Sequence, residues 1–196
     1  ALEHRVFGPA RRRRRPFRVG VVSETAPGIW SIALNPPEGG QIPRYAPGQF
    51  HFLYFAPGPD TEAEEHPFTV SSGAPADSYG STVKESGDFT RSLSALEPGT
   101  PVSVHGPFGR FSYVFHPEET KLVFIAGGIG ITPFMSMLRH MRAYGASRRV
   151  MLFYGARTEA DLVFAEELNE IAAEDGAPAL AEIGRASCRE RVYCEV

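Results

Sequence analysis

A glycine-rich turn contains the residues of this sequence that are best suited to bind a charged ligand. The turn reads Ala126-Gly127-Gly128-Ile129-Gly130-Ile131-Thr132-Pro133, between an apolar run at 122–125 and a segment at 134–141 with helical spacing. Glycine lets a ligand approach the backbone without a Cβ in the way, and proline fits the first turn of a helix. The free N–H groups and dipole of that helix start predict a phosphate site. The alternative is a tight turn between a strand and a helix.

Two further segments combine aromatic, hydroxyl and charged side chains. They are His66-Pro67-Phe68-Thr69 and, further along, Thr82-Val83-Lys84 followed by Gly87-Asp88-Phe89-Thr90. Taken alone, His66 is typical of a surface histidine at the start of a strand. The second segment is also consistent with an ordinary Gly-Asp turn and a helix cap.

Composition limits the function classes. The chain has 196 residues, 42% of them hydrophobic, with a mean hydropathy of -0.19 and a net charge of -3. Such a length allows one large domain or two small ones with a true core. The charge gives no sign of nucleic-acid binding, and no apolar run approaches the ~20 residues that span a bilayer.

The first fifteen residues form a basic arm that ends in the run Arg11-Arg12-Arg13-Arg14-Arg15. One interpretation is a solvated linker arm. Another is a juxtamembrane segment, since the cytoplasmic flanks of membrane helices are rich in Lys and Arg. Nucleic-acid binding ranks third, because nothing downstream supports it.

The last fifteen residues, 182–196, do not continue the pattern before them. Codons for residues 182–192 can spell a common sequencing-library adapter, so we expect the natural sequence to end near Ala181. The alternative is a genuine basic tail. Both cysteines, Cys188 and Cys194, lie in this segment. Without them no disulfide, thiolate metal site or iron–sulfur cluster can be argued, and no metal site is predicted. The start at Ala1, without an initiator Met, also suggests a fragment.

Residues 16–116 have the pattern of a small antiparallel β-barrel. Short apolar runs separated by turn residues predict six strands, at 17–22, 29–34, 48–55, 68–72, 81–84 and 102–104, with a short helix at 89–96. The third strand is aromatic on both faces, which favours a central position in the sheet.

Residues 117–181 have a different pattern. It predicts a strand at 122–125, a helix at 132–143, a strand at 150–154 and a helix at 159–174. This βαβα order implies a parallel sheet, with a domain boundary near His116-Pro117. The expected fold class is therefore a six-stranded β-barrel followed by a partial α/β domain, in which only two parallel strands are predicted.

A barrel followed by a βαβα unit with a glycine-rich first turn resembles the ferredoxin–NADP reductase superfamily of flavoproteins. The resemblance covers roughly Pro16 to Ala181. Soluble members usually carry Arg-x-Tyr-Ser or Arg-x-Tyr-Thr where this chain has His66-Pro67-Phe68-Thr69. The branch that contains ferric reductases and NADPH oxidases carries His-Pro-Phe-Ser/Thr, which is the form found here.

The resemblance implies that the barrel binds FAD. Phe68 would lie against the isoalloxazine ring and Thr69 near flavin N5, as the two catalytic residues, while His66 would contact the ribityl-phosphate side and Pro67 completes the motif. A flat apolar ring favours an aromatic neighbour, and a hydroxyl can donate or accept a hydrogen bond. The ribityl chain and pyrophosphate would be approached by Thr82, Val83, Lys84, Gly87, Phe89 and Thr90.

The resemblance also assigns the glycine-rich turn to the pyrophosphate of NAD(P)H, with Thr132 nearest the nicotinamide. Tyr154 and Gly155 would end the next strand, where the adenosine ribose lies. Arg157 could pair with a 2′-phosphate, which slightly favours NADPH, although a solvated surface arginine explains it equally well. The family's later strands and its Cys-Gly segment are missing here, so weak NAD(P)H binding is expected of this polypeptide.

The function implied is transfer of a hydride from NAD(P)H to FAD, then of single electrons to an acceptor such as haem or ferric iron. In the membrane branch the acceptor is haem in an upstream membrane domain, which would make this chain a cytoplasmic domain of a membrane protein. Other partners would be a small-molecule or protein electron acceptor, and no nucleic acid. The alternatives are a soluble flavin reductase with a diffusible acceptor and a non-catalytic flavin- or nucleotide-binding regulatory module.

Overall fold

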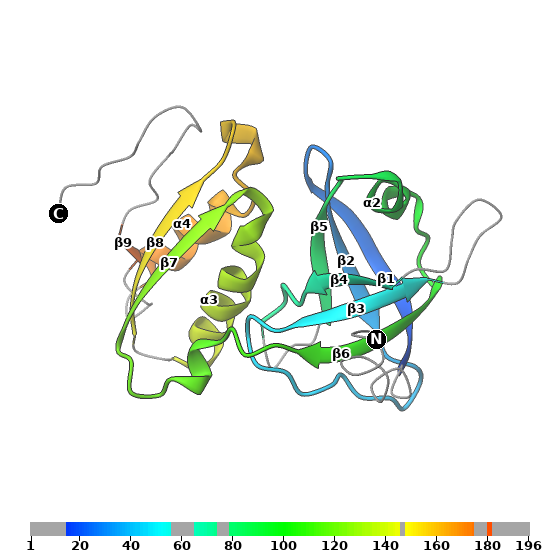
Figure 1. The fold of residues 1–196 in the computed structure, drawn as a ribbon, viewed down its shortest axis with the longest axis horizontal. Helices are drawn as coiled ribbons and strands as arrows, with labels where there is room; N and C mark the ends of the chain where they lie inside the picture. Colours follow the sequence, from blue (N-terminus) through cyan, green and yellow to red (C-terminus); the bar gives the residue numbers. More distant parts are fainter. Residues whose placement is uncertain (1–14, 56–64, 74–78, 146–147, 175–179, 182–196) are drawn as a thin grey trace, which may run out of the picture.

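A computed structural model describes residues 15–55, 65–73, 79–145, 148–174 and 180–181. The predictions for residues 1–14, including most of the arginine run, and for residues 182–196, with both cysteines, lie outside these ranges. Within them, the structure consists of an antiparallel sheet and a separate parallel sheet (Figure 1).

The antiparallel sheet contains six strands in the order β4-β3-β6-β1-β2-β5. Every neighbouring pair is antiparallel, and β3 lies between β4 and β6, inside the sheet as predicted. The strands are β1 (Arg15–Ala26), β2 (Ile29–Asn35), β3 (Phe50–Phe55), β4 (Glu65–Thr69), β5 (Tyr79–Lys84) and β6 (Pro101–Phe108). Alternate side chains point inward, so Phe17, Val19, Ile32, Leu53 and Val104 form the barrel core.

The barrel closes where β4 and β5, the two ends of the strand order, come together. The N–H of Ser71 donates to the carbonyl of Gly80 at 3.0 Å, and the Ser81 hydroxyl donates to the carbonyl of Thr69 at 2.7 Å. Backbone groups of an antiparallel strand alternate in direction, so those of Thr82 and Lys84 point to the same edge as those of Gly80. This edge of β5 therefore presents peptide groups beside β4.

The fourth strand differs from its prediction at 68–72. Strand β4 runs from Glu65 to Thr69, so the whole His66-Pro67-Phe68-Thr69 motif lies within it. Proline has no N–H to donate to a ladder, and it is tolerated here because β4 is an edge strand. Two short helical segments, α2 (Asp88–Ser92) and η2 (Leu93–Ala95), replace the single helix predicted at 89–96.

The parallel sheet has the order β7-β8-β9, from β7 (Lys121–Gly127), β8 (Arg149–Gly155) and the two-residue β9 (Leu180–Ala181). It thus has a third short strand beyond the two predicted. Helix α3 (Thr132–Tyr144) follows the glycine-rich turn as expected, with Pro133 in its first turn. In Figure 1, α3 lies between the parallel sheet and the barrel.

The predicted helix at 159–174 is wrong in its first half. A 3₁₀ turn, η5 (Glu159–Asp161), comes first, and α4 (Ala165–Ala173) begins only after Phe164. Phe164 has a φ of 65°, in the left-handed region, which interrupts any continuous helix. The N–H of Val163 donates to the Tyr154 hydroxyl at 3.1 Å, so a tertiary contact overrides the helical pattern.

Helices α3 and α4 cover one face of the parallel sheet. Phe124 and Leu152 are buried there against Leu138 and Leu168. On the opposite face the side chains of Val123, Ile125 and Met151 are 61%, 74% and 37% exposed. None of the described helices is both long and apolar enough to cross a membrane.

Candidate functional site

Strand β4 and helix α2 bring the His66–Thr69 motif next to Phe89 of the second aromatic and hydroxyl segment. The His66 ring stacks on the Phe89 ring with centroids 3.5 Å apart and planes 18° apart. The Phe68 ring is nearly parallel to that of Phe89, at 6.3 Å and 13°. The side chains of His66 and Phe68 in β4 and of Phe89 in α2 thus form one aromatic surface beside the edge of β5.

Thr69, the last residue of β4, is held by a buried hydrogen-bond network. The Ser81 hydroxyl donates its one hydrogen to the Thr69 carbonyl, so at 2.8 Å it must accept from Nε2–H of His51. The other ring nitrogen, Nδ1, then accepts from the Tyr79 hydroxyl at 2.8 Å. Burial lowers the pKa of His51 to about 3 and raises that of Tyr79, so both are neutral in the fold.

Sequence analysis missed His51, Tyr79 and Ser81. The available signal was a polar residue on the inward face of each strand. His51 lies on the same face of β3 as Leu53, and Ser81 lies on the same face of β5 as Val83. Val83 is itself buried in the barrel core. Only its backbone can therefore contribute to a site at the surface.

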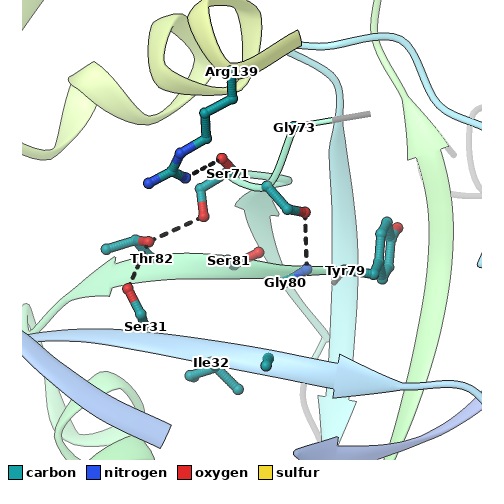
Figure 2. A pocket seen from close by; sticks show the side chains of 11 residues that line it. Ser31, Ile32, Ser71, Gly73, Tyr79, Gly80, Ser81, Thr82 and Arg139 are labelled. Atoms are coloured by element: carbon teal, nitrogen blue, oxygen red, sulfur yellow. Dashed lines mark hydrogen bonds between the residues drawn. The ribbon is translucent and has the colours of Figure 1, made fainter. Parts of the chain in front are cut away.

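The outer face of β5 carries hydroxyl groups. The Thr82 hydroxyl lies 3.0 Å from those of Ser31 and Ser71, and Ser31 lies 2.7 Å from Thr25. Beside them is a cavity of about 280 Å³ whose lining includes Ser72 and the residues labelled in Figure 2, among them Gly73, Gly80 and Arg139. The Thr82 side chain is buried, and its hydroxyl is occupied by Ser31 and Ser71. Like Val83, Thr82 would therefore contact a ligand at the strand edge through its backbone.

Lys84 connects the barrel to the α/β unit. Its ammonium lies 2.9 Å from a carboxylate oxygen of Asp161, in the segment after β8. The hydrogen bond from Lys84, helped by one from Thr158, lowers the pKa of Asp161. The predicted phosphate-binding charge of Lys84 is thus shared with an acidic partner in this structure.

The turn before α2 has the local geometry of a helix cap. Gly87 is its N-cap residue, with a φ of 140°. The Thr90 hydroxyl accepts from the N–H of Ser86 at 2.6 Å and donates to the Gly87 carbonyl at 3.1 Å. The hydroxyl of Thr90 therefore stabilises the turn before α2.

The glycine-rich turn is open to solvent. A Cβ built on Gly127, Gly128 or Gly130 would meet no other atom within 4 Å, and the φ of Gly128 is +50°. The turn continues as η4 (Gly128–Ile131) into the N-terminus of α3. Thr132 is nearly buried, and its hydroxyl donates to the Ile129 carbonyl at 3.1 Å. Empty space beside the positive end of a helix dipole suits an anion.

At the end of β8 the predicted residues divide into buried and exposed. The Tyr154 side chain is buried, its hydroxyl accepts from Val163, and burial raises its pKa to about 12. Its side chain therefore orders the segment before α4 and would leave ligand contacts to the backbone. Gly155 is partly exposed and Arg157 is exposed beside it.

Comparison with known proteins agrees with this architecture. Residues 124–183 match the family model of the oxidoreductase NAD-binding domain. The reductase component of propane 2-monooxygenase from Mycolicibacterium goodii is 32% identical over 73% of this chain, and the flavohemoprotein of Deinococcus radiodurans is 29% identical over 82%. The aligned part makes up only 40% of each relative's length.

A solved structure extends the likeness to both sheets. The flavohemoglobin of Malassezia yamatoensis, described with bound FAD and heme, matches with a TM-score of 0.77 at 20% identity, over 90% of this chain and 46% of that one. The chain also shares the fold of a ferredoxin–NADP⁺ reductase from Plasmodium falciparum, which matches with a TM-score of 0.73 at 16% identity, over 89% of this chain and 74% of that one.

This shared fold confirms the predicted class, a β-barrel followed by an α/β unit. It places the aromatic surface of β4 and α2 in the barrel and the glycine-rich turn in the matched NAD-binding region. The position of the domain boundary near His116-Pro117 stays a prediction.

Proposed function

We propose that this chain is part of an NAD(P)H-dependent flavin oxidoreductase. Its parent protein would accept a hydride from NAD(P)H on FAD and pass electrons singly to an acceptor. The observation that carries the proposal is the aromatic surface of Phe68 and Phe89 next to Thr69, where β4 and β5 come together. A monooxygenase reductase component and a flavohemoprotein among the relatives, and a flavohemoglobin with FAD among the similar structures, support it.

The barrel residues fit a flavin. Phe68 is half-buried and can pack against a flat ring, and the N–H and C=O groups of Thr82 and Lys84 point to the strand edge beside it. Such peptide groups match the donor and acceptor pattern of a flavin pyrimidine edge. Thr69, whose carbonyl is fixed by Ser81, would offer its hydroxyl to the reacting side of the ring. When bound, the flavin supplies the chemistry of accepting two electrons and releasing them one at a time.

The other predicted barrel contacts are part of the same proposal. His66 and Pro67 would lie beside the ribityl chain, and Val83 would contribute its backbone. Gly87, Phe89 and Thr90 would lie near the pyrophosphate. The Lys84 ammonium would contact the pyrophosphate while it also pairs with Asp161.

The turn at Gly127, Gly128 and Gly130 would hold the pyrophosphate of NAD(P)H. The support is the match to the NAD-binding family and the empty space above each glycine. Thr132 and Pro133 would begin the helix beneath the nicotinamide, and Tyr154, Gly155 and Arg157 would border the adenosine ribose. The exposed guanidinium of Arg157 gives NADPH a slight preference over NADH.

The electron acceptor and the membrane location of the protein are proposed from the His66–Thr69 motif alone. His66-Pro67-Phe68-Thr69 has the form seen in ferric reductases and NADPH oxidases, so the proposed acceptor is haem in a membrane domain upstream of this chain. The chain would then be a cytoplasmic domain with Arg11–Arg15 beneath the membrane. Finding soluble sequence in place of apolar spans upstream in the gene would instead favour a reductase with a diffusible acceptor.

The test is reconstitution of the purified chain with FAD, followed by anaerobic addition of NADPH or NADH. Binding of flavin and loss of its visible absorbance are expected. Thr69→Val and Phe68→Ala should slow this bleaching, while Thr100→Val, an isosteric change in the loop before β6, should not. A chain that binds no flavin would refute the proposal, and flavin that is bound but never reduced would favour a regulatory module.

A further inference from the structure

Helix α3 docks on the barrel through the segment that directly follows strand β4. The Ser136 hydroxyl donates to the carbonyl of Ser72 at 2.8 Å, and Nη1 of Arg139 donates to the carbonyl of Ser71 at 2.6 Å. Figure 2 shows Arg139 reaching from the helix to Ser71. Two successive peptide groups of the barrel are thus held by one face of α3.

Arg139 also holds the next helix. Its Nε and Nη2 atoms donate to the two carboxylate oxygens of Glu167 in α4, at 2.6 and 2.5 Å, and its guanidinium lies 4.8 Å above the Phe164 ring. The planar fork of an arginine makes such paired contacts in one fixed orientation. One side chain therefore links the barrel, α3 and α4.

Two glycines of the barrel allow this docking to be close. A Cβ on Gly73 would lie 2.7 Å from the Cβ of Arg139. A Cβ on Gly48 would lie 2.5 Å from the terminal carbon of Met137 and 2.2 Å from the carbonyl of Phe111. A larger residue at Gly73 would push the barrel and α3 apart, whereas one at Gly48 would collide first with the backbone of Phe111.

Inside the barrel the segment is also held by Tyr45, whose hydroxyl lies 3.1 and 2.9 Å from the carbonyl oxygens of Ser72 and Gly73. Ser71, Ser72 and Gly73 line the cavity of about 280 Å³, so part of their surface has no packed neighbour. A side chain beside a void loses the contacts that would otherwise position it. The hydrogen bonds from α3 add a direct connection between this segment, beside the void, and the α/β unit.

Both ends of this connection are proposed functional positions. Ser71 and Ser72 come two and three residues after Thr69, at the proposed flavin site. Helix α3 begins at Thr132, at the proposed nicotinamide site, and reaches Ser136 after about one turn and Arg139 after about two. A rigid helix transmits any displacement at Arg139 to its own N-terminus.

We propose that Arg139, assisted by Ser136, is a positioning residue that sets the distance between the hydride donor and the flavin. This inference rests on the proposed function and adds to it the element that aligns its two sites. Misplacement by about 1 Å can lower a rate by ~100-fold, so a docking contact of this kind matters more to rate than to affinity.

The first experiment compares Arg139→Met with Arg142→Met in the FAD-loaded chain. Arg142 lies on the same helix and pairs with Glu174, which directly follows α4, so it is a matched control. The limiting rate of flavin reduction at saturating NAD(P)H should fall about tenfold or more in Arg139→Met. The affinities for FAD and NAD(P)H should stay within twofold of the unmodified chain in both variants. Arg139→Lys, which can still donate to Ser71, should restore part of the rate.

The second experiment needs no cofactor and measures amide hydrogen exchange in the flavin-free chain. The amides of Ser71 and Gly80 bond to the Gly80 carbonyl and the Ser72 hydroxyl, and they should exchange several-fold faster in Arg139→Met but not in Arg142→Met. If Arg139→Met does not fold, Ser136→Ala replaces it in both experiments.

The outcomes separate the two proposals. Unchanged exchange, or an unchanged reduction rate in a chain that is reduced normally, overturns the positioning role and leaves the proposed function standing. A chain that binds no flavin refutes the proposed function, while the exchange experiment still decides whether Arg139 holds the barrel segment. Equal losses of rate in Arg139→Met and Arg142→Met would show a general effect on α3 and would also overturn the positioning role.

Discussion

Glycines in the barrel and glycines in the turn after β7 have opposite surroundings. A Cβ on Gly80 would lie 2.2 Å from the carbonyl of Ile32, and one on Gly73 would lie 2.7 Å from Arg139. A Cβ on Gly127 or Gly130 would meet no other atom within 4 Å. Packing requires glycine at positions 73 and 80, whereas the surroundings of Gly127 and Gly130 leave room for a side chain.

This difference distinguishes glycines that the fold needs from glycines that leave space for a ligand. Where the chain fills the space beside a glycine, substitution should damage the fold. Where the space is empty, substitution should leave the fold intact and damage only whatever enters that space. Changes in the two regions should therefore give opposite patterns of stability and affinity.

The largest effect is expected from Gly80→Ala. Its Cβ would collide with the backbone of β2 inside a paired ladder, where neither strand can move without breaking the register. We expect the free energy of unfolding to fall by about 3 kcal/mol, measured by urea denaturation. Gly130→Ala in the same assay should change it by less than about 0.5 kcal/mol. Equal losses in the two variants would contradict the comparison.

Gly130→Ala should instead weaken nucleotide binding. The new methyl group would project into the space proposed for the pyrophosphate, so the dissociation constant for NAD(P)H should rise about tenfold, equivalent to ~1.4 kcal/mol. Titration of the FAD-loaded chain with NADPH and NADH measures this, with FAD affinity as the internal control. An unchanged affinity would remove the turn from the nucleotide site.

A moderate effect of pH on stability is expected from His51 in the barrel. Below its ordinary pKa near 6.5 the histidine of the unfolded chain binds a proton, whereas in the fold it stays neutral down to about pH 3. The unfolded state then binds more protons, so stability should fall as the pH drops from 7 to 5. His51→Gln should flatten this dependence in urea denaturation. His140, whose pKa is also lowered by burial, is present in the unmodified chain and in the His51→Gln variant. Its contribution therefore cancels when the pH dependences of the two are compared. A slope that persists unchanged would exclude His51 as its source.

The smallest effect is expected at the ion pair that joins the two regions. Exposed pairs contribute little to stability, so Lys84→Met and Asp161→Asn should both leave the melting temperature nearly unchanged. Their effects on flavin binding should differ. Lys84→Met should weaken FAD binding about threefold, while Asp161→Asn, which frees the lysine, should not weaken it. Equal effects of the two changes would indicate that Lys84 acts only through Asp161.

The sequence was sufficient for those features that depend on neighbours along the chain. Alternating apolar residues predicted the barrel strands, and the change to helical spacing after Lys121 predicted the βαβα order. The strand–glycine–helix arrangement around Gly128 likewise depends on local residue types, and the structure has it.

Features that depend on distant contacts could not be predicted in this way. The left-handed Phe164 follows from the hydrogen bond between Tyr154 and Val163, which a helical pattern does not reveal. The His51–Ser81–Thr69 network joins three strands, and the Arg139–Ser71 contact joins residues 68 positions apart. Each becomes visible only when the fold brings the partners together.

Strand β7 has a consequence for handling the protein in solution. It stands at one end of the described parallel sheet, and Val123 and Ile125 present apolar surface beside its unpaired edge. Edges of this kind pair readily with other chains. The purified polypeptide should therefore self-associate as its concentration rises, with elution in size-exclusion chromatography shifting to larger species. Val123→Lys and Ile125→Lys should restore a concentration-independent elution.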